Sequence, residues 1–231
     1  DHEAGALDCA LDRFSLAAQL RPGDPVLHNN WAMALQEAGD LEQALASYRL
    51  ALELRPTYAD AHSNLAGALL EKGDLQQGLH HFRQAITHDP DHVTAQNNLA
   101  MALLEAGEHI EGWRLYEWRF RCNPNLIQAL PGPRWYGDYP QADELVLVEE
   151  QGLGDSLQFI RYAPLLREKF QRVSFCGGSK LSGLLHRSGL LDAVYLHTDL
   201  CNRSDYQWMP LLSAPGVLGV HRDAPRCTAP Y

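Results

Sequence analysis

The fold is decided by the stretch GDLEQALASYRLALELRP, residues 39–56, because its pattern returns every 34 residues through the first half of the chain. Its first and last letters each belong to a series of four: Gly5, Gly39, Gly73 and Gly107, and Pro22, Pro56, Pro90 and Pro124. A small residue and an aromatic residue keep the same interval, at Ala10, Ala44, Gly78 and Gly112, and at Phe14, Tyr48, Phe82 and Tyr116. A fixed period of this length indicates one helical unit that is copied and stacked.

Each position of the unit has a physical role. A glycine between two apolar-periodic stretches ends a helix in the left-handed conformation at no steric cost. Ala44 lets the second helix approach the first closely, and Tyr48, on the same face one turn later, fills the space beside it. Pro56 ends the second helix and turns the chain into the next unit. The pattern therefore predicts pairs of helices, one pair in each unit.

This pattern resembles the tetratricopeptide (TPR) repeat, and the resemblance covers residues 1–124. We expect a half repeat followed by three complete repeats in an α-solenoid. Gly5 would be the turn glycine of a unit whose first helix lies upstream, so the sequence is expected to be a fragment of a longer protein.

Composition narrows the class of protein. The chain has 231 residues, 45% of them hydrophobic, and a formal net charge of −10 from 19 Lys and Arg against 29 Asp and Glu. These values fit a protein of two modules without a membrane span, and they disfavour non-specific binding to nucleic acid or anionic lipid. The cysteines are odd in number and widely spaced, which argues against a disulfide framework or a zinc site and favours the cytoplasm. They are Cys9, Cys122, Cys176, Cys201 and Cys227.

A row of amides is the candidate binding feature of the repeats. Asn30, Asn64 and Asn98 fall at one position of the first helix of each complete repeat. First helices line the concave side of such a solenoid, where amides at repeat spacing suit the backbone of an extended peptide. This row resembles that of the O-linked N-acetylglucosamine transferases, which hold acceptor peptides with asparagines at this position. An equally weighted alternative is that Asn supports the fold here.

Histidines also follow the period, at His28 and His62, but the third member of the series is Gln96. Residues one repeat apart converge poorly, so we expect partly packed surface histidines and no metal site, with the same role for His80 and His81.

The last repeat departs from the pattern. Where the other units place Ala17, Ala51 and Ala85, it has Arg119, within the aromatic segment Gly112–Phe120. Because a terminal repeat has no neighbour of its own kind, bulky groups there predict docking against a different module.

The second module is expected at residues 143–231, after a Pro- and Gly-rich connector at 125–142. A short apolar strand at 145–149, a glycine-rich turn at 151–155 and a helix at 156–170 form a β–α unit. Further strands are expected at 172–176, 192–196 and 206–209, with a helix ending near His186 between the first two. This alternation predicts a parallel, Rossmann-like α/β sheet whose ligands bind beyond the carboxyl ends of the strands.

A dinucleotide site is not expected at the glycine-rich turn. Gly152 and Gly154 fit the first two glycines of the G-x-G-x-x-G pattern, but the third position is Leu157 and the second strand ends in Cys-Gly-Gly instead of at an acid. The chain also has no G-x-x-x-x-G-K-[ST] phosphate loop.

Three segments outside the regular repeat pattern carry a second resemblance. They are GWRLYEWR at 112–119, PRWYG at 133–137 and EQGLGDSLQFIRY at 150–162. Together with the TPR units they resemble bacterial TPR proteins with a heptosyltransferase-like glycosyltransferase domain, over nearly the whole chain. The resemblance implies a GT-B fold of two Rossmann-like domains, of which this sequence holds the acceptor-side half.

The resemblance also implies functional residues and partners. Asp155 occupies the place of the general base, and Gln151, Gly152, Gly154, Gln158 and Arg161 form the acceptor loop around it. The implied donor is a nucleotide-sugar bound by a second Rossmann domain outside this sequence, so the fragment needs no cofactor and is not expected to catalyse alone. The implied acceptor is a polypeptide or a glycan. The proline that closely follows the base in heptosyltransferases is displaced here to Pro164.

Two alternatives stay open at this point. Asp155 could cap the helix that it opens, which is the commonest role of an Asp before a helix. The whole chain could be a non-catalytic TPR interaction module in which a degenerate transferase half covers the end of the solenoid.

Overall fold

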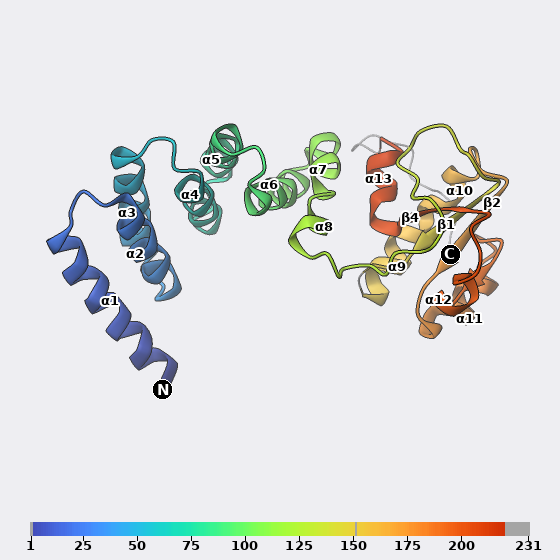
Figure 1. Ribbon diagram of the computed structural model, residues 1–231, viewed down its shortest axis with the longest axis horizontal. Helices are drawn as coiled ribbons and strands as arrows, with labels where there is room; N and C mark the ends of the chain where they lie inside the picture. Colours follow the sequence, from blue (N-terminus) through green and yellow to red (C-terminus); the bar gives the residue numbers. More distant parts are fainter. Residues whose placement is uncertain (1, 151, 220–231) are drawn as a thin grey trace. The chain divides into compact units, whose positions relative to one another are not determined.

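The computed structural model describes residues 2–150 and 152–219, without the side chains of residues 2–8 and 10. The chain divides into two compact units, residues 1–107 and 108–231, which are described one after the other (Figure 1). Among the described helices, none is both long and apolar enough to cross a bilayer.

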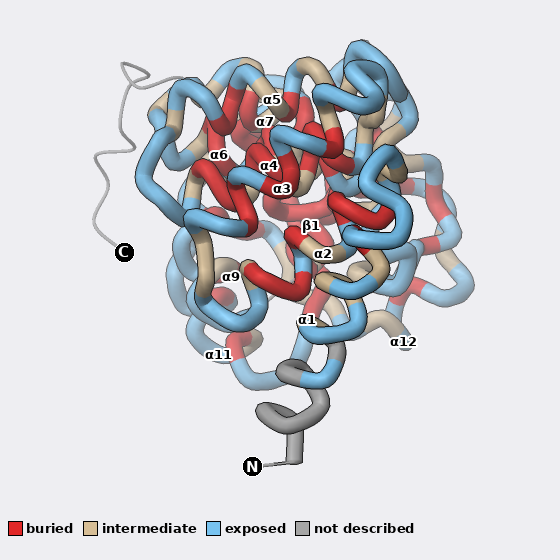
Figure 2. Tube along the Cα trace, turned by 90° about the vertical axis from the view of Figure 1, so that its left-hand side faces the viewer, coloured by how far each residue is buried: buried red, intermediate tan, exposed pale blue. Residues whose placement is uncertain are grey.

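The first unit consists of helices joined by short turns. These are α1 (His2–Leu20), α2 (Pro25–Glu37), α3 (Leu41–Leu54), α4 (Ala59–Glu71), α5 (Leu75–His88) and α6 (Val93–Glu105). Helices α2 and α3 form one pair and α4 and α5 the next, so the 34-residue period is confirmed as a repeat of helix pairs. Figure 2 shows the buried stretches within these helices and the exposed turns that join them.

The turn glycines adopt the predicted backbone. Gly39, Gly73 and Gly107 have φ of +84°, +89° and +83°, a region that residues with a Cβ rarely enter. The aspartates that follow Gly39 and Gly73 are the N-caps of α3 and α5. Asp40 and Asp74 accept hydrogen bonds of 3.2 Å from the backbone N–H groups of Gln43 and Gln77.

The small and aromatic positions pack as expected. Ala44 and Phe82 are fully buried and Tyr48 is 1% exposed. At Gly78 an added Cβ would lie only 2.8 Å from Leu70 Cδ2, so the close approach of α5 to α4 requires a small residue there.

One expectation for this unit is wrong. Gly5 does not form a turn, because α1 runs as a single helix from His2 to Leu20. The helix is continuous through Gly5, which the interior of an α-helix tolerates at a cost of about 1 kcal/mol relative to alanine.

The second unit begins inside the last repeat. Its elements are α7 (His109–Tyr116), α8 (Arg119–Cys122), β1 (Glu144–Val148), α9 (Leu153–Phe159), η1 (Ile160–Tyr162), α10 (Ala163–Leu166), β2 (Arg172–Cys176), α11 (Ser179–Arg187), β3 (Val194–Tyr195), α12 (His197–Leu200), β4 (Gln207–Pro210), η2 (Leu211–Ser213) and α13 (Ala214–Val217). Helix α7 occupies the place of a second repeat helix, but it ends after eight residues where α3 and α5 have 14.

The four strands form one parallel sheet in the order β3-β2-β1-β4. Central strand β1 pairs Leu145 with Val173 on one side and with Gln207 on the other. The predicted parallel α/β arrangement is therefore present, and β2 has the predicted bounds. The stretch Asn123–Asp143 before β1 has no helix or strand, although Arg134 makes an isolated bridge to Trp208 of β4.

The helix expected at 156–170 has different bounds. It begins at Leu153 and breaks after Phe159 into the 3₁₀ turn η1 and the short helix α10. Pro164 lacks a backbone N–H and cannot continue an α-helical ladder, which explains the break just before it.

Each face of the sheet carries its own core. Leu145, Leu147, Phe175 and Met209 point to the face covered by α9, α10 and α11. Val146, Val148 and Trp208 point to the opposite face, which is covered by Leu130 of the connector and Leu200 of α12, and by Tyr206. This alternation along a fully buried strand is what a two-sided parallel sheet requires.

Candidate functional site

The amide row lies on the first helices of the repeats, as the sequence predicts. Asn30 is exposed, whereas Asn64 and Asn98 are half-buried. Asn64 Nδ2 donates a 3.0 Å hydrogen bond to Oδ1 of Asn29 in the preceding repeat, and Asn29 Nδ2 donates to Asn30 Oδ1 at 3.3 Å. Asn30 and Asn64 are thus linked through Asn29, and donor and acceptor capacity remains at Asn64.

Two contacts show how α2 and α4 lie beside one another. Asn64 reaches Asn29, and two turns later Glu71 Oε2 accepts a 2.8 Å hydrogen bond from Gln36 Nε2. Both contacts join residues 35 apart, so the two first helices run side by side in register. Gln36 Oε1 in turn accepts from Tyr48 of α3 at 3.1 Å.

Sequence reasoning missed three residues of the first helices. The predicted amide row did not include Asn29. The methionines Met33 and Met101, which are 49% and 52% exposed, were not identified as candidates either. The two methionines could have been found from the 34-residue period, since they are two repeats apart and Gly67 occupies the position between them.

The second periodic series has a structural role. His28 and His62 place Nε2 at 2.8 and 3.0 Å from the carbonyl oxygens of Pro22 and Pro56, and Gln96 Nε2 donates to Pro90 O at 3.0 Å. Each residue therefore satisfies the carbonyl of the proline six positions earlier, in the turn between repeats. These side chains are more deeply buried than we expected, at 4%, 8% and 7% exposure.

His62 also meets His81 of α5, with the two Nδ1 atoms 3.0 Å apart and the rings stacked. Because Nε2 of His62 carries its proton toward Pro56, Nδ1 of the neutral ring accepts a hydrogen bond from His81. Burial lowers the pKa of His62, and burial together with His62, His80 and Arg49 lowers the pKa of His81 to about 4. In the described part of the chain, no group of three or more His, Cys, Asp or Glu is arranged to hold a metal ion.

The docking of the aromatic segment is confirmed within the second unit. Trp113 and Tyr116 of α7 pack against the core on the α9 face of the sheet, and Trp113 meets Phe159 edge-on with ring centroids 5.6 Å apart. Trp113 also lies beside Gly216 of α13, where an added Cβ would be in van der Waals contact with it at 3.4 Å.

Arg119 lies at the edge of the sheet where β1 and β4 end, and it is hydrogen-bonded there on several sides. Its Nε donates to Glu150 Oε2 at 2.8 Å, and the other carboxylate oxygen accepts from Leu212 N, just after β4, at 2.7 Å. Its remaining N–H groups reach Ser213 Oγ, Tyr116 O and Glu117 Oε1 at 2.9, 2.9 and 3.1 Å. The sequence indicated that Arg119 was unusual but not that its partner is Glu150, 31 residues away.

The Arg119–Glu150 pair is almost fully removed from water. Arg119 is 5% exposed at its side chain and Glu150 is 0% exposed. Burial raises the pKa of Glu150, and the bonds from Arg119 and Leu212 oppose that rise. Removing one partner of such a pair leaves an uncompensated buried charge, whereas the intact pair is satisfied on every side.

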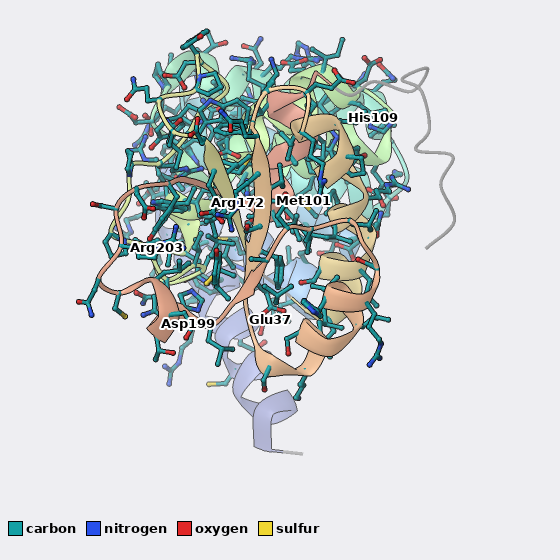
Figure 3. The ribbon with its side chains drawn as sticks, turned by 90° about the vertical axis from the view of Figure 1, so that its right-hand side faces the viewer. Glu37, Met101, His109, Arg172, Asp199 and Arg203 are labelled. Carbon is teal, nitrogen blue, oxygen red and sulfur yellow. The ribbon has the colours of Figure 1, made fainter. Side chains whose placement is uncertain are left out.

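A second buried carboxylate lies at the opposite edge of the sheet. Glu144, at the start of β1, accepts hydrogen bonds from Ser174, Tyr195 and Arg203 at 2.6, 3.0 and 2.9 Å. Arg172 approaches it to 3.7 Å, and both arginines are labelled in Figure 3. Burial favours the protonated form, but the three hydrogen bonds outweigh it, and the pKa of Glu144 is lowered.

The predicted acceptor loop follows β1. Gln151 lies outside the described residues. Gly152 is the N-cap of α9 with φ of −65°, and Asp155 is the third residue of that helix, half-exposed. Asp155 is therefore not the N-cap, because α9 begins three residues earlier than expected. Gln158 and Arg161 are exposed farther along, on α9 and η1.

Glu149, immediately after β1, ties this loop to its neighbour. One carboxylate oxygen accepts from Ser156 Oγ at 3.2 Å, and the other accepts from Gly178 N, in the turn after β2, at 2.6 Å. Glu149 and Glu150 thus connect the end of β1 to the segments following β2 and β4. Neither was among the predicted site residues.

Comparison with known proteins defines the class of the first unit. Residues 33–73 match the model described as TPR repeat, and residues 68–111 match the one described as tetratricopeptide repeat. The chain therefore contains TPR repeats.

Individual similarities are more distant. Protein FlbA of Caulobacter vibrioides is 41% identical over 58 residues, which are 23% of this chain and only 9% of FlbA. Among solved structures, MamA is 20% identical, with a TM-score of 0.48, over 55% of this chain and 69% of MamA. YrrB, a TPR protein with an unusual peptide-binding site, is 22% identical, with a TM-score of 0.46, over 48% and 58%. A mutant of the O-GlcNAc transferase of Thermobaculum terrenum is 20% identical, with a TM-score of 0.47, over 84% of this chain and 39% of the enzyme.

The lowered histidine pKa values predict an acid-sensitive repeat unit. Unfolded histidines bind protons near pH 6.5, whereas folded His81 binds them only near pH 4. Stability is therefore fully present above pH 6.5 and is lost as the pH falls toward 4. Because His81 is partly exposed to water, we expect a loss of about 1 to 2 kcal/mol from this pair.

Urea unfolding followed by circular dichroism between pH 7.5 and 4 measures this loss. His81→Ser, which introduces the residue found at the equivalent position 47, makes the loss of stability with falling pH smaller, whereas His186→Ser, at an exposed position of α11, leaves that loss unchanged. Parallel curves for wild type and His81→Ser would contradict the assignment.

Proposed function

We propose that the repeats hold an extended polypeptide along the amide row of Asn30, Asn64 and Asn98. The observation that carries this proposal is the hydrogen bond from Asn64 to Asn29, which fixes the amide of Asn64 against the first helix of the preceding repeat. An extended peptide presents N–H and C=O groups along its length, and terminal amides pair with both. Binding through the backbone accepts many sequences, which suits a protein-interaction module.

The amide row also contributes to folding, and this contribution has to be separated from binding. Asn64 links two repeats, as the fold-support alternative requires, whereas Asn30 is exposed at the end of the network. In this proposal the half-buried Asn64 supports the fold and contacts the peptide, whereas the exposed Asn30 serves mainly in binding.

Replacing Asn30, Asn64 and Asn98 together with Ala is expected to weaken peptide binding about tenfold or more, since each net hydrogen bond contributes on the order of 1 kcal/mol. Fluorescence anisotropy with a library of labelled, unstructured peptides measures the affinity, and circular dichroism checks that the helices persist. The matched control is Gln43→Ala with Gln77→Ala, which removes exposed amides from the second helices. Equal affinity of wild type and the triple variant would exclude the amide row as the contact.

We also propose that the α/β unit is the acceptor-side half of a nucleotide-sugar-dependent glycosyltransferase. The strand order β3-β2-β1-β4 is the order of the first four strands in nucleotide-binding Rossmann sheets. The glycines of the loop after β1 favour a ligand there: a Cβ on Gly152 or Gly154 would meet nothing within 4 Å, and neither has positive φ. Neither packing nor backbone conformation requires glycine at these positions, and the open space beside them is available to a ligand that approaches the backbone closely.

In this proposal Asp155 is the general base. It is half-exposed in the first turn of α9, at the carboxyl edge of the sheet, where it can take a proton from an acceptor hydroxyl. The rival proposal, a non-catalytic module, is favoured by a different observation. Arg119 and Glu150 fill the edge between β1 and β4, where open sheets of this order place their ligands.

Asp155→Asn is expected to lower sugar transfer by about 100-fold or more, the usual contribution of a general base. The assay uses the longer protein that we expect to contain the donor-binding domain, and it follows release of nucleoside diphosphate from a nucleotide-sugar. Asp143→Asn, an exposed acid at the opposite edge of the sheet, serves as control and keeps full activity. Unchanged turnover in Asp155→Asn would remove the catalytic role, and no turnover in the wild type would favour the interaction module.

A further inference from the structure

Almost all of the net charge belongs to the repeats. Residues 1–107 contain 15 Asp and Glu against six Lys and Arg, a net charge of −9, whereas residues 108–231 contain 14 against 13, a net charge of −1. Within the repeats, the charges are also segregated by helix. The first helices α2, α4 and α6 contain no Lys or Arg at all.

The carboxylates of these helices lie on the same stripe as the amide row. Glu37, Glu71 and Glu105 each follow the row's Asn by seven residues, which is two helical turns, and all three are exposed. Glu71 accepts a hydrogen bond from Gln36, and no ion pair joins any of the three to a residue that the structure describes.

Exposed methionines lie between the amides and the carboxylates. Met33 and Met101 each follow the row's Asn by three residues, and Glu37 and Met101 are labelled in Figure 3. The equivalent position of α4 is Gly67, where a side chain would meet nothing within 4 Å. Thioether side chains adapt to apolar surfaces of varied shape, including the aliphatic stems of lysine and arginine.

We propose that the polypeptide held by the repeats is basic, with Lys or Arg side chains lying over the methionines and ending at Glu37, Glu71 and Glu105. This inference rests on the proposed peptide-binding role and adds the chemistry of the partner. The amides hold the backbone, the methionines contact the stems, and the carboxylates pair with the charged ends. Because no cation of the first helices competes for these carboxylates, the whole face selects against acidic segments.

The test compares two labelled, unstructured 15-residue peptides, one containing five lysines and the other with every lysine replaced by glutamine. We expect the lysine peptide to bind wild type at least tenfold more tightly in 50 mM salt, with an advantage that shrinks as salt is raised. Glu37→Gln, Glu71→Gln and Glu105→Gln together reduce this advantage about tenfold and leave the glutamine peptide unaffected. Glutamine at position 71 keeps a polar partner for Gln36.

A matched control variant distinguishes an effect of the three glutamates from an effect of the overall negative charge of the repeats. Asp12→Asn, Glu42→Gln and Glu53→Gln remove an equal number of negative charges from exposed positions of α1 and α3, and we expect less than a twofold effect on either peptide. An equal loss in both triple variants, or no preference for the lysine peptide, would overturn the inference while leaving peptide binding intact. If neither peptide binds wild type, the proposed binding role fails as well.

Discussion

The guanidinium of Arg119 and the carboxylate of Glu150 meet where two strands of the sheet end, with almost no access to water. Taking two charges out of water is costly, and the cost is recovered only where good geometry and further hydrogen bonds satisfy both groups. Here Leu212, Ser213, Tyr116 and Glu117 supply those bonds. The pair fixes the segment after α7 against β1 and β4, and the aromatic rings of α7 then pack on the core beside it.

This constraint explains why the last repeat is unlike the others. In a complete repeat the second helix continues for 14 residues and packs through Ala51 or Ala85. In the last one, α7 stops at Tyr116 and an arginine replaces the alanine. The last repeat keeps the turn glycine Gly107, but its second helix has different packing residues. These residues pack against the sheet instead of against a further repeat. The described residues from 108 to 219 accordingly form a compact unit with the α/β elements.

The parts of the fold that depend on local chemistry could be predicted from the sequence. Gly39, Gly73 and Gly107 require only their own backbone conformation, and β2 alternates polar Arg172 and Ser174 with apolar residues and ends at two glycines. The expectation for Gly5 failed because a turn glycine bends the chain only where two helices can pair across it. The start of α9 was misplaced because Gly152 and Gly154 read as a turn, although the second of them is helical.

The polar networks could not be predicted, because their partners are far apart in the sequence. Arg119 was recognised as unusual from the period alone, but its pairing with Glu150 depends on the register of β1 against β4. The bond from Asn64 to Asn29 likewise depends on how two repeats stack, and the sequence placed Asn29 outside the amide row. Among the candidate site residues, the period located the amide row, whereas the choice of Asp155 came from a resemblance and remains a proposal.

Hydrogen exchange on the Arg119→Ala variant tests most directly whether this buried pair holds the last half repeat to the sheet. Because the change leaves Glu150 buried without its counter-charge, we expect a local loss of about 3 to 5 kcal/mol. The amides of α7 and of the segment after β4 should then exchange at least 100-fold faster, while α2 to α5 keep their protection. Arg114→Ala, on an exposed face of α7, is the control and should exchange like wild type. Unchanged protection of α7 in Arg119→Ala, or an equal loss throughout α2 to α5, would contradict this account.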